Sequence, residues 1–423
     1  MQFIRRSALL LIFFAVFSGL TIPTVRAAGL DDDDFCESTL ESLKHKIPSA
    51  RARIIGRIEV PSSKWFAWER DGSRQLLASI DSSNVLRVFE PAKTLEPFYV
   101  SRWSTSDGQS KSFTHAEWVT ATPGAPLIQA GDDRGNLVTF EPMTHPEPSA
   151  RFQGSPVRVE PHSIELSDGQ WVTAMSMANL QRVRIVPVGR WNAVHDLSTR
   201  GRIVAMAAHK TLLGDALLSV STDSWLDIYK LGETQELISS TRLKGASIRP
   251  RWVTDESGES LLVTMDEDSH VHVVFPESHR QELKTEALSK EPGTLHILKQ
   301  KDGVWVLAEA RKPRSARLYK IQDKNIEVVR DLPQSIADSN DRKSLVAGPS
   351  DEPLLVSAKV VDGKKMIALT DANGTDGSEI SVELDHASES VRRYEMLTLD
   401  ANRRQLAVQT NQKIYIIEIT ARR

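Results

Sequence analysis

Two histidines and two aspartates lie close together in one short stretch of the sequence. His270 and His272 are two residues apart, and on a β-strand this spacing places both imidazoles on the same face. Asp266 and Asp268 come just before them. Zinc accepts imidazole and carboxylate ligands, so His270 and His272 are candidate metal ligands. The same residues also suit the polar edge of a sheet near a turn, and the sequence places no further ligand beside them.

These residues belong to a pattern that the chain repeats from Arg53 onward. An apolar strand is followed by a tight polar turn and then by a strand that ends in an aromatic or branched residue. Residues 118–140 and 252–275 are the clearest pair, since both begin with Trp-Val-Thr and end with Phe. Apolar runs separated by Asp, Ser, Gly and Asn predict β-hairpins.

The ends of these strands return at a regular interval. They are Phe89, Phe140, Ile185, Tyr229, Phe275, Tyr319, Thr370 and Ile417, at spacings of 44 to 51 residues. Such a period with about four short strands per unit is typical of a β-propeller, and it makes two unrelated β-sandwiches the weaker interpretation. Eight blades are expected. Seven stays an alternative, because the first strand of the Ile185 unit must come from the weakly patterned stretch Ser163–Leu166.

The two ends of the repeat region suggest how the ring closes. Each unit supplies three inner strands and then an outer one, such as Glu96–Arg102. The last marker strand, Lys413–Thr420, has no outer strand after it, and Arg53–Val60 has no partner at the other end. Pairing these two segments would remove both exposed edges. We therefore expect an all-β fold, with one propeller domain over residues 53–423 closed by its N-terminal strand.

At the level of fold the chain resembles a divergent WD-repeat propeller of the exported bacterial type. The resemblance rests on the hairpins Asp81–Phe89, Asp133–Phe140, Thr222–Tyr229 and Asp268–Phe275. No unit begins with Gly-His and none ends with Trp-Asp, the two hallmarks of that family. The resemblance implies a bias toward scaffolding and transfers no functional residues. It also implies that the turn aspartates brace their turns through backbone N–H groups; these are Asp81, Asp133, Asp223 and Asp268.

The tryptophans fall into two groups. Trp68, Trp118 and Trp252 share one position of the repeat, which favours packing between blades. Trp103, Trp191 and Trp225 lie outside that register and are candidate binding residues. Arg134, in a tight turn, is a fourth candidate. By the same resemblance, Trp225 and Arg134 lie in turns on one rim of the ring, where exposed aromatic and arginine side chains are typical of interaction sites.

The N-terminus has the features of a secretory signal peptide. Arg5 and Arg6 precede an apolar run over residues 8–17, and Val25-Arg26-Ala27 resembles a cleavage site. We expect residues 1–27 to be removed and no membrane anchor to remain. Residues 28–52 would then form an acidic segment with a short cap helix, because Cys36, Leu40, Leu43 and Ile47 share one helical face. Whether Cys36 is free or paired stays open.

Composition limits the partners. The chain has 53 Lys and Arg against 56 Asp and Glu among its 423 residues, and this net charge of −3 disfavours a nucleic-acid partner. The sequence lacks a Gly-x-Ser-x-Gly elbow, a phosphate loop and a His-Glu-x-x-His motif. Our leading hypothesis is an exported, soluble, monomeric scaffold that binds envelope or periplasmic proteins without a cofactor. A hydrolase or lyase with its site at the central channel, and a carbohydrate or cell-wall binder, are the alternatives.

Overall fold

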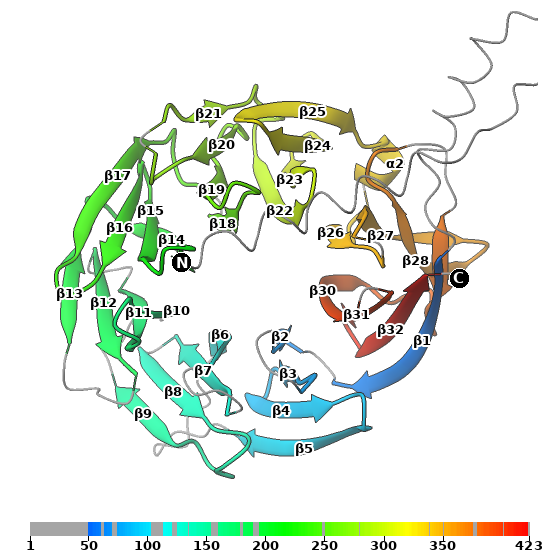
Figure 1. Ribbon diagram of the computed structural model, residues 1–423. Coiled ribbons are helices and arrows are strands. Elements are labelled where there is room, and N and C mark those ends of the chain that lie inside the picture. The colour runs from blue at the N-terminus through cyan, green and yellow to red at the C-terminus, as the bar shows by residue number, and fades with distance from the viewer. Residues whose placement is uncertain are drawn as a thin grey trace, which may run out of the picture. The chain divides into compact units, whose positions relative to one another are not determined.

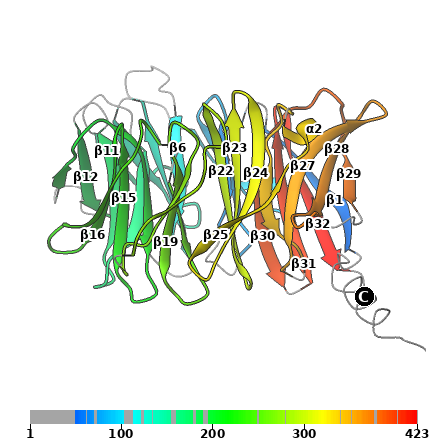
Figure 2. The same ribbon diagram turned by 90° about the horizontal axis from the view of Figure 1, so that it is seen from above.

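The part of the chain that the structure describes forms one ring of β-sheets. The computed structural model describes residues 50–60, 63–69, 74–102, 113–120, 125–133, 135–153, 160–177, 181–188, 194–247, 250–278, 280–337, 339–349, 351–374, 379–400 and 402–421. Eight four-stranded antiparallel sheets stand around a central channel, and each forms one blade (Figure 1). In a view across the ring, the strands run through its thickness (Figure 2).

The strands of each blade follow the chain from the channel outward, except for the outer strand of blade 8. Blade 1 is β2 (Trp65–Trp68), β3 (Leu77–Ile80), β4 (Val85–Glu90) and β5 (Thr94–Arg102). Blade 2 is β6 (Phe113–Val119), β7 (Leu127–Asp132), β8 (Asn136–Phe140) and β9 (Ala150–Gln153). Blade 3 is β10 (Pro161–Glu165), β11 (Trp171–Met177), β12 (Arg182–Pro187) and β13 (His195–Ser198). Blade 4 is β14 (Ile203–Lys210), β15 (Ala216–Thr222), β16 (Trp225–Leu231) and β17 (Glu236–Arg242).

The second half of the ring has the same order. Blade 5 is β18 (Arg251–Thr254), β19 (Ser260–Met265), β20 (Val271–Val274) and β21 (Leu283–Lys284). Blade 6 is β22 (Pro292–Gln300), β23 (Gly303–Arg311), β24 (Arg314–Gln322) and β25 (Asn325–Asp331). Blade 7 is β26 (Ser344–Ala347), β27 (Pro353–Val361), β28 (Lys364–Asp371) and β29 (Ile380–Glu383). Blade 8 is β30 (Val391–Asp400), β31 (Arg403–Thr410), β32 (Lys413–Ala421) and β1 (Ala50–Glu59).

The predicted eight-bladed propeller is confirmed, and the seven-bladed alternative is excluded. The periodic marker residues lie on the third strand of each sheet, except Phe275, which directly follows β20. The irregular unit also forms a full blade, because β10 takes Ser163 and Ile164 into its ladder with β11. A helix of one turn, α2 (Gln334–Ala337), joins blades 6 and 7. No helix among the described residues has the length and apolar character needed to cross a membrane.

The apolar core is divided into eight clusters, and each lies between two neighbouring blades. This arrangement follows from the sequence pattern, since third-strand residues such as Val88 and Ile185 are fully or almost fully buried. A blade therefore buries apolar side chains on both of its faces, unlike a sheet with one wet face. The cluster between blades 2 and 3 is the smallest among the described residues, with Leu137, Met175 and Val186.

The ring closes as predicted, through the N-terminal strand. β1 pairs antiparallel with β32 over the whole length from Ala50↔Ala421 to Glu59↔Lys413. The strand begins at Ala50, three residues before the start expected from the sequence. Ile58 and Val60 are buried against blade 1 and complete the cluster between blades 8 and 1. The signal peptide, the acidic segment and the cap helix with Cys36 lie outside the described residues, and they stay predictions.

Two of the repeated tryptophans link neighbouring blades. Trp118 Nε1 donates a hydrogen bond of 3.0 Å to the carbonyl oxygen of Ala67 on the inner strand of blade 1. Trp252 Nε1 does the same with Ala207 of blade 4, at 3.1 Å. Trp68 is almost fully buried between blades 8 and 1. These contacts are the inter-blade packing that the shared repeat position predicts.

Deleting residues 50–60 should lower the free energy of unfolding by several kcal/mol. The deletion removes the β1–β32 ladder and two buried aliphatic side chains, each of which contributes roughly 2–3 kcal/mol. Urea unfolding of the two proteins measures the loss. Deletion of residues 28–49 is the matched control and should have a much smaller effect; equal losses would contradict closure by β1.

Candidate functional site

The turns between the second and third strands of the blades define one face of the ring, which we call the turn face. Strands within each blade are antiparallel, so the turn that ends the second strand lies on the same face as the start of the first strand. Trp225, the first residue of β16, directly follows one of these turns, and the Asp266–His270 segment forms another. The turn face therefore gathers most of the predicted site residues that the structure describes.

One side-chain oxygen braces several of these turns, and in blade 1 it comes from the expected residue. Asp81 Oδ1 accepts hydrogen bonds from the backbone N–H groups of Ser83 and Val85, at 2.8 and 3.0 Å. In the turns where Asp133, Asp223 and Asp268 were expected, the oxygen belongs to the residue at the strand end, one or two positions earlier; these residues are Asp132, Thr222 and Asp266. In these four turns the bracing oxygen belongs to the last residue of the second strand or to the residue directly after it.

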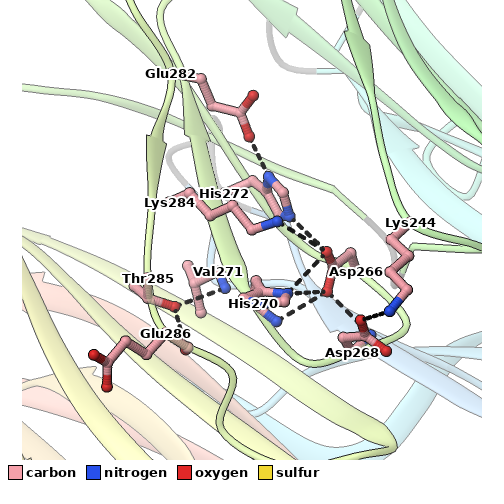
Figure 3. A network of polar contacts seen from close by, with 10 residues as sticks. All are labelled: Lys244, Asp266, Asp268, His270, Val271, His272, Glu282, Lys284, Thr285 and Glu286. Atoms are coloured by element: carbon pink, nitrogen blue, oxygen red, sulfur yellow. Dashed lines mark hydrogen bonds and ion pairs between the residues drawn. The ribbon is translucent and has the colours of Figure 1, made fainter.

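The three expected aspartates occupy other positions in their turns. Asp133 and Asp223 are exposed. Asp268 is half-buried, and its carboxylate forms an ion pair with Lys244 (Figure 3). Asp268 therefore contributes charge at the surface of blade 5, while the buried carboxylate that organises this turn is Asp266.

Asp266 is the centre of a polar network in blade 5 (Figure 3). Its carboxylate is fully buried and accepts hydrogen bonds from the backbone N–H groups of Asp268 and His270, at 3.1 and 2.9 Å. It also accepts hydrogen bonds from His270 Nδ1 at 3.1 Å and from His272 Nε2 at 2.9 Å. The predicted pair of histidines thus shares one carboxylate.

His272 lies between two carboxylates. Its other ring nitrogen, Nδ1, donates to Glu282, which precedes β21. Burial alone would lower the pKa of His272, but the hydrogen bonds to Asp266 and Glu282 outweigh this effect and raise the pKa above 6.5. Burial would likewise raise the pKa of Asp266, yet the hydrogen bonds from His272 and His270 lower it to about 2. Both ring nitrogens of His272 therefore face carboxylates, an arrangement that favours the protonated form of the imidazole.

The same atoms would be the ligands of a metal ion. Ligand atoms of Asp266, His270 and His272 all lie within 4.8 Å of one another. A cation here would have to displace the His272 proton and replace hydrogen bonds to Asp266 and Glu282. The geometry therefore suits an ion-pair network that joins β20 to the outer edge of its blade better than it suits a metal centre.

A second group of possible metal ligands was not anticipated from the sequence. His115, Glu117 and His162 have ligand atoms within 4.8 Å of one another. His115 and Glu117 lie two residues apart on β6, a spacing visible in the sequence, but His162 comes from β10 of the next blade. Two imidazoles and a carboxylate are donors that zinc accepts. Only the ring topology brings them together.

Trp225 is held in place by an arginine from the connection between blades 3 and 4. The guanidinium carbon of Arg200 lies 4.4 Å from the ring centroid of Trp225. Arg200 also forms an ion pair with the buried carboxylate of Asp227, which accepts a hydrogen bond from Ser240 at 2.8 Å. Trp225 is half-buried at the start of β16, next to the turn face. The other binding candidates, Arg134, Trp103 and Trp191, lie outside the described residues.

His272→Gln should destabilise the protein by about 3 kcal/mol at pH 5.5, because the change removes the nearest cation from a buried carboxylate and leaves Lys284 at 3.8 Å. The raised pKa of His272 means that its contribution is complete below pH 6.5 and is lost as the pH rises through the folded-state value. The contribution of Asp266 is present above pH 3.8 and is lost toward pH 2.

Urea unfolding of wild type and variant between pH 4 and pH 9 measures this dependence. The difference between them should be largest at about pH 4 to 6.5 and should shrink at pH 9. His195→Gln, at an exposed histidine of β13, is the control and should leave stability unchanged. A pH-independent difference for His272→Gln would show that its imidazole is not charged in the folded state.

Comparison with known proteins supports the fold and nothing finer. No protein-family model and no curated protein matches the sequence. Among solved structures, the computationally designed Ika8 protein superimposes with a TM-score of 0.50 and 11% identity, over 76% of this chain and 83% of that one. The β-propeller domain of Cps50 (Swd1) from Myceliophteria thermophila has a TM-score of 0.48 and 15% identity, over 75% and 96%. At these identities the likeness concerns the fold alone, and the WD-repeat-like propeller expected from the hairpins is what the eight blades form.

Proposed function

We propose that this protein is exported and acts as a protein-interaction scaffold in the periplasm or cell envelope. A closed ring supports this proposal, because rigid sheets hold many surface turns in fixed positions and those turns can vary without loss of the core. Export is supported by the basic N-terminus, the apolar run after it and the Val25-Arg26-Ala27 sequence. The partner would be another envelope or periplasmic protein.

The Trp225–Arg200 stack carries this proposal. Interface hot spots are enriched in tryptophan and arginine, and rigid side chains lose little conformational entropy when a partner binds. Arg200 is fixed by Asp227 and in turn covers one side of the Trp225 ring. A partner that packs against the accessible side of this ring would meet an aromatic surface that is already ordered. The turn face of blade 4 is therefore the proposed contact surface.

Trp225→Ala should weaken partner capture by more than about 1 kcal/mol while costing about 1 kcal/mol of stability. Mild cross-linking of the envelope fraction followed by mass spectrometry identifies the partner, and titration of that partner gives the affinity. Leu213→Ala is the matched control: Leu213 is 88% exposed in the turn between β14 and β15, on the opposite face of the same blade.

Three results would contradict the assignment of this surface. Unchanged capture by folded Trp225→Ala would remove Trp225 from the interface. A larger effect of Leu213→Ala would place the interface on the other face of the ring. Loss of folding in Trp225→Ala would show that the indole of Trp225 is part of the apolar core.

The mature protein should begin at Ala28. Intact-mass measurement on protein from the envelope fraction should show the loss of the first 27 residues, as the Val25-Arg26-Ala27 site predicts. Replacement of Ala27 by Gln should block cleavage and leave the full mass. A full-length wild-type species that stays with the membrane would contradict export as a soluble protein.

A further inference from the structure

The inner strands of blades 2 and 3 bring two histidines and a carboxylate together near the turn face. His115 and Glu117 come from β6, and His162 comes from β10. Their ligand atoms lie within 4.8 Å of one another, and the two imidazole rings are tilted by 34° with their centroids 5.6 Å apart. His115 and Glu117 are half-buried, whereas His162 is 8% exposed. Three possible ligands of one metal ion therefore meet where two blades adjoin.

The interface between these two blades has little apolar packing. Its cluster is the smallest among the described residues, with three members. Polar contacts join the blades nearer the channel, where Glu117 accepts a hydrogen bond from the backbone N–H of Ser163. Gln129 Oε1 accepts two more, from the hydroxyl groups of Ser163 and Thr173 at 2.7 and 2.6 Å. These contacts hold β10 against β6 and β7, and they direct the Glu117 carboxylate toward the strand that carries His162.

A cavity beside this group gives an ion access to it. The cavity has a volume of about 410 Å³ and is lined by inner-strand residues of blades 5, 6 and 8 and by His115. A half-buried side chain at a cavity wall can change rotamer rapidly, so an ion need not pass through the packed core. Zinc bonds of about 2.1 Å place the ligand atoms of a tetrahedral site about 3.4 Å apart, so side-chain movements of about 1 Å complete the site.

We propose that His115, Glu117 and His162 bind a zinc ion that links blades 2 and 3. Zinc accepts two imidazoles and a carboxylate, and this set leaves its fourth position for water or a small molecule from the cavity. The ion would add bonds across the interface that has the smallest apolar cluster of the described part of the ring. In the Asp266 cluster, by contrast, the carboxylate is fully buried and already accepts hydrogen bonds within its own blade. The proposal is independent of the scaffold function, since it uses no residue of the Trp225 surface.

Titration of metal-free protein without a polyhistidine tag, using zinc as the only added ligand, tests the site. Calorimetry should show one zinc ion per chain with micromolar or tighter affinity. Zinc should also raise the melting temperature, because the three ligands come together only in the folded ring.

Two variants remove one ligand each. His115→Gln should weaken zinc binding by at least about a hundredfold, since loss of a group that only supports a metal ligand already costs roughly 10- to 100-fold. Glu117→Gln should weaken binding in the same direction. It removes the charge but keeps an oxygen that can accept the hydrogen bond from the Ser163 N–H, so it decides the result if His115→Gln does not fold.

His270→Gln is the matched control, because it removes a histidine from the Asp266 cluster. It should bind zinc with the affinity of the wild type. Loss of binding in this variant, with normal binding by His115→Gln and Glu117→Gln, would place the ion in blade 5 and overturn the proposal. Absence of stoichiometric zinc binding by the wild type would overturn it as well. Binding that leaves the melting temperature unchanged would contradict a zinc link between the blades.

Discussion

A blade of this ring has two apolar faces, and it can bury both only when another blade lies on each side. This requirement explains why the core is divided into eight clusters between blades. It also explains why closure matters: an open row of blades would expose an apolar face at each end. β1 meets this requirement by supplying the outer strand of the last blade and placing Ile58 and Val60 against the first.

The need to bury both faces of every blade also made the fold predictable from the sequence. Burial on both faces selects apolar third strands, and the chain must return to that pattern once in every blade, so Phe89, Tyr229 and Ile417 mark the period without any motif. Closure was predictable because the repeat region has one unpaired strand at each end. Pairing these two strands with each other removes both exposed sheet edges. The start of β1 was misplaced by three residues, since Ala50 and Ala52 carry little of the apolar alternation that marks a strand.

The site was less predictable, because its contacts join segments that the sequence does not relate. The turn aspartates Asp133, Asp223 and Asp268 were placed by their likeness to Asp81. In their turns, however, a bracing oxygen comes from an earlier residue at the strand end, and the turns differ in length. His272 shows the same difficulty. Its spacing from His270 was visible, but the Glu282 carboxylate, whose hydrogen bond helps to raise the pKa of His272, comes from the segment before the outer strand.

The inner strands show how a repeat built for packing can still carry varied chemistry. One inner-strand position can be compared between blades: it pairs with the second-strand residue that lies three positions before the residue whose oxygen braces the turn. In blades 1, 2, 4, 5 and 8 this position is occupied by Ala67, Glu117, Ala207, Arg251 and Glu395. In blades 2 and 5 the next residue along the inner strand is a tryptophan, Trp118 or Trp252. Its indole N–H donates a hydrogen bond to the backbone carbonyl oxygen at the equivalent position of the preceding blade, that of Ala67 or Ala207. In these two pairs of blades the inter-blade hydrogen bond uses the backbone at this level, whereas in blade 2 the Glu117 side chain itself accepts a hydrogen bond from the Ser163 N–H of blade 3. Alanine, glutamate and arginine therefore occupy equivalent positions in different blades, so the inner strands keep one backbone register around the ring while their side-chain chemistry varies from blade to blade.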